Sequence, residues 1–331
     1  YLPYDLPCSV RRFLDRIRPG VAIIVETEIW PTLYHELGRR RIPLVMASAR
    51  VSTRSVDRYR RMASLFRETL SHGILIGAQS AADAERFRAI GAPPDRVRVT
   101  GNVKFDLELP QSEVDAGRDF RRRAAPARPV WIAGSTHEGE EEAVLAAQAI
   151  VQARHPSALL ILVPRHPQRF DAVRSLLRKR GHAYAQRSSG ELPVDAQEIF
   201  LVDTLGELQM FYAAADVAFV GGSLVPIGGH NLLEPAALGM PILSGPHTHN
   251  AQDIAELLAQ AGVLRIVRSR EELGQRVADY FDDPARARQD GARGQEVITQ
   301  SRGAVAQLVE MVLPLLNSQD AGKDASAAGS P

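Results

Sequence analysis

The residues from 219 to 243 are the ones whose types and spacing best predict chemistry. An apolar strand is expected first, then a loop, then a helix that begins at Leu232, and then a second strand. The loop contains four glycines, namely Gly221, Gly222, Gly228 and Gly229. Glycine lets backbone N–H groups approach a ligand closely, and a helix N-terminus carries a partial positive charge. The stretch therefore predicts a seat for a phosphate group.

Polar residues of the same stretch predict how the remainder of a nucleotide is held. Glu234 falls in the first turn of the expected helix, and its carboxylate can accept hydrogen bonds from both hydroxyls of a ribose. A nucleotide-sugar donor is usually held in this way. We count Gly222, Ser223 and His230 among the possible cleft residues beside it.

A second group of polar residues comes directly after the apolar segment 159–163, which predicts a buried strand. Pro164, Arg165 and His166 fall at its carboxyl end, where ligands of open α/β sheets bind. The guanidinium of Arg165 offers a fork of donors to a phosphate. The alternative interpretation is an arginine that pairs with a structural carboxylate.

The end of the expected strand 130–133 carries residues that suit either a cap or a ligand. Ser135 and Thr136 are good helix caps, and capping alone accounts for Thr136 and for several of the acids that follow. His137 and Glu138 either belong to this cap or face the cleft. The sequence leaves both interpretations open.

A further turn follows the expected strand 199–202. The backbone at Gly206, Glu207 and Leu208 can read the edge of a base, because Gly206 permits close approach. The alternative is a plain turn from a strand into a helix. Three such loops on one sheet edge favour the binding interpretation.

The first half of the chain places two carboxylates at one strand end. Glu26 and Glu28 follow the apolar segment 21–25. A carboxylate at such a position is costly unless it is used. We expect one of them to orient an acceptor hydroxyl or a catalytic group, and the other to cap the helix that begins near Trp30.

All of these residues need a scaffold of alternating strands and helices. Apolar segments alternate with helical spacing along both halves of the chain, which predicts an α/β protein with parallel sheets covered on both faces. We expect a partial N-terminal domain over 1–105, a linker over 106–128, a C-terminal domain over 129–316 and a disordered tail over 317–331.

Composition excludes several classes of function. The 331 residues carry a net charge of +1, so no global field favours nucleic acid. The single cysteine, Cys8, cannot form an internal disulfide, which fits a reducing cytosol. No apolar run reaches the roughly 20 residues of a membrane span. No cluster of ligands predicts a metal site.

Basic runs are the remaining feature of the charge pattern. They lie at 39–41, 58–61 and 121–123. They predict either solvated helix faces or contact with an anionic membrane surface or a phosphorylated acceptor.

Taken together, the blocks resemble the 3-deoxy-D-manno-octulosonic acid (Kdo) transferases of lipopolysaccharide assembly. The resemblance runs in order from Tyr1 to about Leu316. The matching blocks are Tyr1-Leu-Pro-Tyr-Asp, Glu26-Thr-Glu-Ile-Trp-Pro, Gly101-Asn-Val-Lys-Phe-Asp, Gly134-Ser-Thr-His-Glu-Gly-Glu, Pro164-Arg-His-Pro, Gly206-Glu-Leu, Phe219-Val-Gly-Gly-Ser and Gly228-Gly-His-Asn-Leu-Leu-Glu.

The resemblance implies a GT-B type glycosyltransferase, in which two doubly wound parallel-sheet domains face a cleft. It implies a CMP-Kdo donor, a lipid A precursor as acceptor, and peripheral association with the cytoplasmic face of the inner membrane, without a cofactor or metal. The family's CMP contacts fall on Pro164, Arg165, Gly206, Glu207, Leu208, Asn231, Leu232, Leu233 and Glu234.

One departure from the family pattern concerns the catalytic base. In the family it is a glutamate of an early Gly-Glu block, and we expect that block to lie upstream of Tyr1, so the N-terminal domain is expected to be incomplete. Glu26 and Glu28 do not replace it. Two alternatives stay open, namely another GT-B enzyme such as a UDP-sugar transferase or epimerase, and a truncated CMP-binding fragment without catalytic activity.

Overall fold

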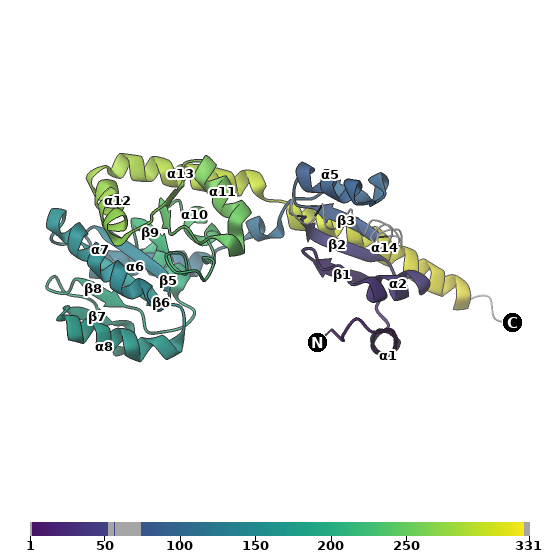
Figure 1. Cartoon of the computed structure of the whole chain (residues 1–331), viewed down its shortest axis with the longest axis horizontal. Coiled ribbons are helices and arrows are strands. Elements are labelled where there is room, and N and C mark those ends of the chain that lie inside the picture. Colours follow the sequence, from purple (N-terminus) through teal and green to yellow (C-terminus); the bar gives the residue numbers. More distant parts are fainter. Residues whose placement is uncertain (1, 52–55, 57–73, 328–331) are drawn as a thin grey trace. The chain divides into compact units, whose positions relative to one another are not determined.

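The computed structural model describes residues 2–51, 56 and 74–327, with residues 317–327 described by their backbone only. The chain divides into two compact units, each described here by itself. Unit 1 contains residues 1–106 and 301–331, and unit 2 contains residues 107–300. Figure 1 shows the ribbon with its elements labelled.

Unit 1 is built on a four-stranded parallel sheet in the order β1-β2-β3-β4. Strand β2 is buried along its whole length, whereas edge strand β1 exposes Ile23 and Val25. The strands are β1 (Ala22–Val25), β2 (Leu44–Ala49), β3 (Ile74–Ala78) and β4 (Val97–Val99). Its helices include α1 (Pro7–Ile17), α2 (Pro31–Arg39), α5 (Ala81–Ala89) and α14 (Ala304–Ala327).

Two sequence-based expectations for unit 1 need comment. The pattern did not indicate α1, although Val10 and Leu14 at helical spacing are both buried in the core of unit 1. Helical spacing in the sequence also predicts a helix over 56–70. That segment lies outside the described residues apart from Val56, and so does the basic run 58–61.

Unit 2 is built on a seven-stranded parallel sheet in the order β11-β10-β9-β5-β6-β8-β7. Its strands are β5 (Val130–Thr136), β6 (Leu159–Pro164), β7 (Tyr184–Gln186), β8 (Ile199–Leu201), β9 (Val217–Val220), β10 (Ile242–Ser244) and β11 (Leu264–Ile266). Short strand β7 was not expected, and the other six coincide with apolar segments of the sequence. Its helices are α6 (Gln111–Ala124), α7 (Glu140–Arg154), α8 (Phe170–Arg180), α9 (Leu208–Ala213), α10 (Leu233–Ala237), α11 (Gln252–Gln260), α12 (Arg270–Asp282) and α13 (Pro284–Ser301).

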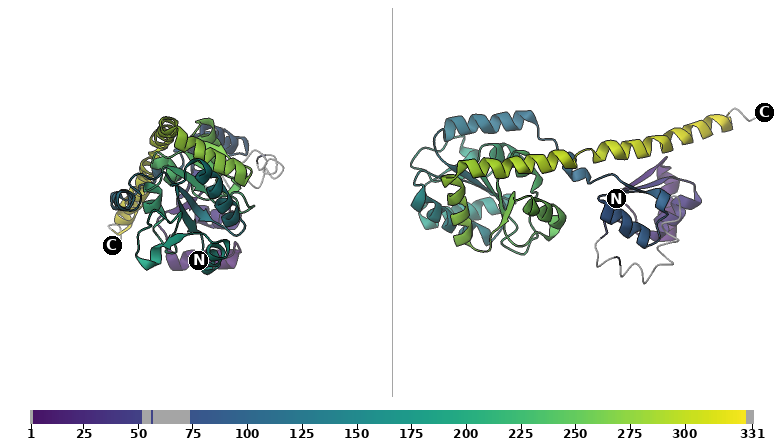
Figure 2. Two further views of the ribbon diagram at one scale, coloured as in Figure 1. Left: turned by 90° about the vertical axis from the view of Figure 1, so that its left-hand side faces the viewer. Right: turned by 90° about the horizontal axis from the view of Figure 1, so that it is seen from above.

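Alternate residues of the central strands build two separate cores in unit 2. On β5, Trp131 packs into a core with α7, α8 and α12, while Val130 and Ile132 pack into a core with α6 and α9. Successive side chains of a strand point to opposite faces, so a near-continuous apolar strand needs helices on both sides. Figure 2 shows helices on both faces of this sheet.

The boundary between the units differs from the expected one at α6. Its residues were expected to form a linker with a helix; the helix is present, but it belongs to unit 2. The physical reason is the ring of Phe120, whose centroid lies 4.9 Å from that of Phe200 and 5.2 Å from that of Phe211. The segment has few apolar residues, yet the ring of Phe120 packs it against the core of unit 2.

The boundary also differs at α14. Its first residues were expected to belong to the C-terminal domain, and its last residues to a disordered tail. The helix belongs to unit 1, and its backbone is helical to Ala327. Asp106 accepts hydrogen bonds from the N–H groups of Gly303 and Val305, both at 2.6 Å. Leu308 and Met311 are buried there with Ala47, so contacts distant in sequence hold α14 on unit 1.

The strand order of unit 2 reverses beside β5. The chain runs outward from β5 through β6, and later returns to place β9 on the other side of β5 before it continues to β10 and β11. Ligands of open α/β sheets bind outside the carboxyl ends of the strands at such a reversal. Within the described residues, no helix is long and apolar enough to span a membrane.

Candidate nucleotide-binding site

The carboxyl ends of β5, β6 and β9 bring together most of the residues singled out from the sequence of unit 2. The N–H of Arg165 donates to the carbonyl of Thr136 at 2.9 Å, and the N–H of Gly221 donates to the carbonyl of Gly134 at 2.8 Å. These bonds join the three strand ends just beyond the sheet. The reversal in strand order and the predicted polar residues therefore coincide.

Glu140 holds the glycine-rich loop in place. This fully buried carboxylate accepts hydrogen bonds from the N–H groups of Gly222, Ser223 and Leu224, at 2.7, 2.9 and 2.8 Å. It also accepts one from the N–H of His137 at 3.0 Å. The sequence analysis missed this role, because Glu140 is one of several acids at the start of α7 and nothing local distinguishes it.

The predicted phosphate seat is corrected by these bonds. The N–H groups of residues 222–224 are taken by Glu140, and those of Gly228 and Gly229 donate to the carbonyl of Gly222, at 3.0 and 2.7 Å. Helix α10 has only five residues, and the N–H of its Leu233 donates to Oδ1 of Asn231. The glycines shape the loop, but its amides are not free to cradle an anion.

Three histidines meet where the phosphate seat was expected. The Nε2 atoms of His137 and His230 lie 2.7 Å apart, and their rings are stacked with centroids 5.0 Å apart. The ring of His166 meets that of His137 edge-on at 5.2 Å. A Cβ on Gly222 would come within 2.9 Å of the His230 ring, so a glycine is needed beside the pair.

The surroundings of the histidines disfavour their charged forms. Burial lowers the pKa of His230 to about 4, and the charges of His137, Arg165 and His166 add to the effect. The pKa of His137 is lowered as well, first by burial, while Glu140 opposes the shift. The pair is therefore neutral at pH 7 in the ligand-free protein.

Arg165 is the exposed cation of this site. Its guanidinium forms no hydrogen bond or ion pair with any residue that the structure describes. Nearby Arg169 differs, since it pairs with Glu138 and Glu141, both at 3.3 Å. Arg165 thus has no structural carboxylate among the described residues, whereas Glu138 has a partner in Arg169.

In the turn at 206–208, backbone atoms rather than charged side chains are open to a ligand. Gly206 is exposed with a φ of +82°, and nothing lies within 4 Å of a Cβ built on it. The carboxylate of Glu207 is engaged by Arg187 at 2.7 Å and by the hydroxyl of Thr204. Glu207 accordingly fixes the turn through its side chain, and Leu208 begins α9.

Glu234 and its neighbours form a small polar group at α10. Oε1 of Glu234 accepts hydrogen bonds from Asn231 at 3.1 Å and from Gln209 at 3.4 Å. Asn231 is exposed, whereas Leu232 and Leu233 are buried in unit 2. The buried side chains of Leu232 and Leu233 therefore hold residues 231–234 against the core of unit 2.

The remaining predicted residues at these strand ends are structural. The hydroxyl of Ser223 donates to the carbonyl of Val220 and accepts from the N–H of Gly245, so it is hydrogen-bonded both as donor and as acceptor. Ser135 has a φ of +57°, a left-handed conformation that is strained outside glycine. The expectation that Ser135 and Thr136 cap the following helix is wrong, because Gly139 is the N-cap residue of α7. The buried hydroxyl of Thr136 forms no hydrogen bond with the described residues.

The two predicted carboxylates of unit 1 have separate partners. Glu26, with a φ of +63°, lies 2.6 Å from Nζ of Lys104, and Glu28 accepts from Nε1 of Trp30 at 3.2 Å. The expectation that one of them caps the helix near Trp30 is wrong. Asp5 does so instead, accepting from the N–H groups that begin α2.

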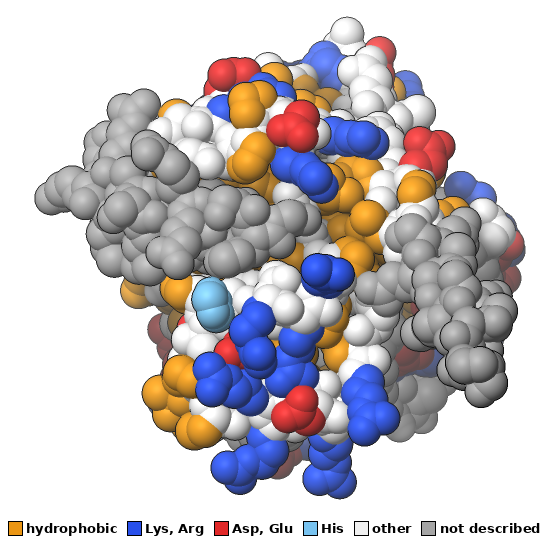
Figure 3. All heavy atoms as spheres, turned by 90° about the vertical axis from the view of Figure 1, so that its right-hand side faces the viewer, with side chains coloured by type: hydrophobic (Ala, Val, Ile, Leu, Met, Phe, Trp, Pro, Cys, Tyr) orange, Lys and Arg blue, Asp and Glu red, His pale blue; other side chains and the backbone are white. Residues whose placement is uncertain are grey.

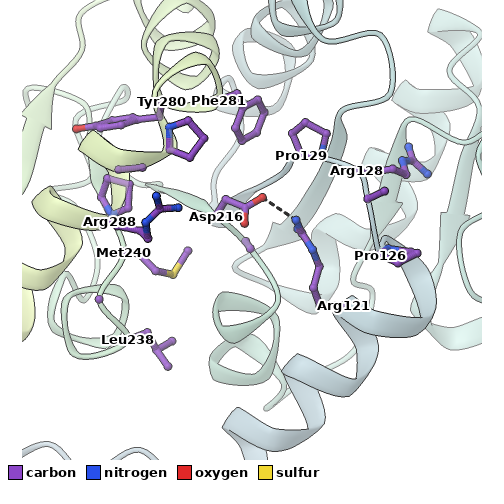
Figure 4. A pocket seen from close by; sticks show the side chains of 16 residues that line it. Arg121, Pro126, Arg128, Pro129, Asp216, Leu238, Met240, Tyr280, Phe281 and Arg288 are labelled. Carbon is purple, nitrogen blue, oxygen red and sulfur yellow. Dashed lines mark hydrogen bonds and ion pairs between the residues drawn. The ribbon is translucent and has the colours of Figure 1, made fainter.

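A cavity of about 440 Å³ lies elsewhere in unit 2, at the amino-terminal ends of β5, β9 and β10. Figure 4 shows Arg121 and Asp216 pointing toward each other there, with Met240, Phe281 and Arg288 around them. None of the predicted site residues lines it. Among the described residues, no group of three or more His, Cys, Asp or Glu side chains is arranged to hold a metal.

The two parallel sheets with helices on their faces define a fold of the GT-B type. A solved UDP-GlcNAc 2-epimerase from Neisseria meningitidis shares the fold over 93% of this chain and 79% of its own, with a TM-score of 0.58 and 15% identity. The C-terminal CMP-Kdo binding domain of WaaA from Acinetobacter baumannii matches 57% of this chain over 99% of its own length, with 30% identity and a TM-score of 0.55.

Sequence comparison is more specific. A family model described as 3-deoxy-D-manno-octulosonic-acid transferase (kdotransferase) matches residues 1–107. The 3-deoxy-D-manno-octulosonic acid transferase of Haemophilus influenzae is 39% identical over 317 residues, which cover 96% of this chain and 74% of the relative. That of Bordetella pertussis is 39% identical over 82% of this chain and 64% of its own length.

The chain belongs to the family of 3-deoxy-D-manno-octulosonic acid transferases, and it is a glycosyltransferase. The family resemblance inferred from the sequence blocks is confirmed, as is the GT-B fold class.

Proposed function

We propose that the protein transfers Kdo from CMP-Kdo to a hydroxyl of a lipid A precursor during lipopolysaccharide core assembly. The observation that carries this proposal is the unpaired guanidinium of Arg165 beside the histidine pair, at the strand-order reversal of unit 2. A solved C-terminal CMP-Kdo binding domain matches 57% of this chain at 30% identity, which supports a donor domain in this chain. Unit 2 would be the donor domain and unit 1 the acceptor domain.

The charges of the site suit a donor with one phosphate. In the proposed reaction a base removes the proton of an acceptor hydroxyl, the oxygen attacks the anomeric carbon of Kdo, and the bond to CMP breaks with its electron pair on the phosphate. The leaving phosphate needs fixed positive charge. Arg165 supplies it, without a metal ion. The base is not assigned to Glu26 or Glu28, which have other partners.

The nucleoside contacts follow from the remaining geometry. The backbone from Gly206 to Leu208 would read the base, because the exposed face of Gly206 is open. Glu234 would accept from the ribose hydroxyls through Oε2, since Oε1 already serves Asn231 and Gln209. Pro164 ends β6 and sets the direction of Arg165.

Peripheral association with the inner membrane is part of the proposal. Helix α1 exposes Arg12 and Arg16, and apolar Leu6 and Ile17 at its two ends are each 57% exposed. Figure 3 shows Lys and Arg side chains gathered on this end of unit 1, around α1 and α2. Basic groups beside exposed apolar ones favour the surface of an anionic bilayer.

Several arginines of the basic runs form ion pairs within the protein. Arg39 and Arg40 pair with Glu36 and Asp15, and Arg121 pairs with Asp216. The membrane proposal therefore rests on Arg12 and Arg16.

Calorimetric titration of the full chain tests the donor assignment. CMP and CMP-Kdo should bind, and UDP should bind at least ten-fold more weakly. Radiolabelled CMP-Kdo with a lipid A precursor tests transfer, and sedimentation with vesicles containing anionic lipid tests membrane association. Preference for UDP over CMP would contradict the proposal and favour a UDP-sugar enzyme.

A further inference from the structure

The contact between His137 and His230 fixes how many protons the pair carries. Their Nε2 atoms are 2.7 Å apart, a distance at which one must donate a proton and the other must accept it. The ring that accepts carries its own proton on Nδ1, because a neutral imidazole has one N–H. The neutral pair thus already offers one Nδ1–H donor, and one added proton gives it a second donor and a positive charge.

The Nδ1 atoms are available to a ligand. Neither forms a hydrogen bond with a residue in the part of the chain that the structure describes, and neither is among the buried polar atoms that lack a partner. Nearby Thr136 has a fully buried hydroxyl that finds no partner among the described residues. Polar groups at this strand end are thus unsatisfied in the ligand-free protein.

The charges around the pair are mostly positive. Arg165, His166 and Arg169 act on His137, and Arg165 and His166 act on His230. The opposing carboxylate is Glu140, whose oxygens already accept four backbone N–H groups. Glu138 and Glu141 are paired with Arg169. An anion placed here would meet the guanidinium of Arg165, which no described carboxylate compensates, and would favour protonation of the pair.

The donor proposed above carries two anionic groups close together. In a 2-ulosonic acid the carboxylate is attached to the anomeric carbon, which is also the atom that carries the phosphate. A site for this donor therefore needs a second anion-binding group beside the phosphate partner. The histidine pair lies beside Arg165 and has this character.

We infer that the His137–His230 pair binds the carboxylate of the donor's sugar acid and takes up one proton as the donor binds. The inference rests on the proposed function, which it deepens by assigning the group that distinguishes an ulosonate donor from a neutral-sugar donor. Donor binding would then be linked to pH, while binding of the nucleotide alone would not use the pair.

Calorimetry with two ligands tests the inference on the full chain. CMP-Kdo carries the carboxylate, whereas the methyl phosphodiester of CMP lacks it and keeps a constant charge near neutral pH. Titrations at pH 7 in two buffers of different ionisation enthalpy count the protons taken up. We expect about one proton for CMP-Kdo and none for the methyl ester. Affinity for CMP-Kdo should rise about ten- to thirty-fold from pH 7.5 to 6.0, because uptake of one proton changes affinity about tenfold per pH unit.

His230→Gln separates the pair from other sources of protons. The variant should still bind the methyl ester with unchanged affinity, but it should lose the proton uptake and the pH dependence with CMP-Kdo. His137→Gln should behave in the same way. His182→Gln is the matched control, since His182 pairs with Glu198 before the start of β7 and should keep both properties.

The outcomes are distinct for the two proposals. Binding of both ligands without proton uptake overturns the inference and leaves the proposed function intact. Equal uptake with both ligands assigns the pair to the phosphate and also overturns it. Failure of CMP-Kdo to bind the wild-type chain removes the proposed function and the inference together. If a variant does not fold, the comparison of the two ligands on the wild-type protein still decides.

Discussion

Glu140 accepts a hydrogen bond at 2.7 Å from the N–H of Gly222, a residue 82 positions later in the chain. The bond ties the start of α7 to the loop that follows β9, and two further loop amides share the same carboxylate. The loop beside the candidate site is therefore held by a charge from a different element. This relationship makes the shape of the loop sensitive to one carboxylate.

Glu140→Gln should lower the free energy of unfolding by about 2–3 kcal/mol, because hydrogen bonds to a charged acceptor are strong and the amide presents N–H to N–H. CMP affinity should fall as well, since the loop beside Arg165 loses its anchor. Denaturant titration and calorimetry check both. Glu142→Gln, on the exposed side of the same helix, is the control. Similar effects from both variants would show that the buried bonds carry no special weight.

Arg165→Ala should weaken binding of CMP much more than binding of cytidine, with a difference of about 1.5–3 kcal/mol for the lost charge-assisted bond to phosphate. Stability should stay unchanged, because the guanidinium has no partner among the described residues. Calorimetry with both ligands measures the difference. Lys179→Ala removes an exposed cation of α8 and should alter neither affinity. Equal losses for CMP and cytidine would refute the phosphate assignment.

Glu234→Gln should weaken CMP strongly and 2′,3′-dideoxy-CMP hardly at all. A carboxylate accepts from both hydroxyls of a diol, while an amide has one accepting oxygen, and here that oxygen already serves Asn231 and Gln209. A purely structural role predicts instead a small drop in melting temperature with unchanged binding. Calorimetry with the two nucleotides distinguishes the two roles, and equal weakening of both would exclude the ribose contact.

Gly222→Ala should destabilise the protein more than Gly190→Ala. Both glycines have positive φ, at +68° and +75°, so each substitution carries a backbone cost of about 1–2 kcal/mol. Only at Gly222 would the new Cβ meet a neighbour, the His230 ring at 2.9 Å, which adds about 1–3 kcal/mol of overpacking. Denaturant titration compares the two variants. Equal losses would mean that the histidine ring moves aside freely.

Acid should destabilise the wild-type chain more than His230→Gln. The pKa of His230 in the folded protein is about 4, below its ordinary value of about 6.5, so the unfolded chain binds more protons between these values. The stability associated with the neutral ring is full above pH 6.5 and falls as the pH drops toward 4. Denaturant midpoints from pH 7.5 to 4.5 check this. Parallel curves for the two proteins would contradict the lowered pKa.

Many strands and loops of this protein could be predicted from local sequence pattern. Continuous apolar segments such as 130–133 and 159–163 predicted strands that are buried on both faces, because no polar side chain interrupts them. Polar residues placed directly after those segments predicted which loops share a sheet edge, since parallel strands end on the same side. His137, Arg165 and His230 were thereby assigned to one region, and the ordered motifs identified the family.

Only the tertiary structure decided what these residues contact. Glu140 rather than a ligand satisfies the loop amides, and Asp5 rather than Glu28 caps α2. Phe120 packs the helix of the expected linker into unit 2. In each case the residue that makes the contact lies 27 or more positions away in the sequence, or the sequence offers several equivalent residues beside it. The reason is physical: a hydrogen bond or ring contact depends on distances of a few ångströms, and those are set by how distant elements pack rather than by local sequence pattern.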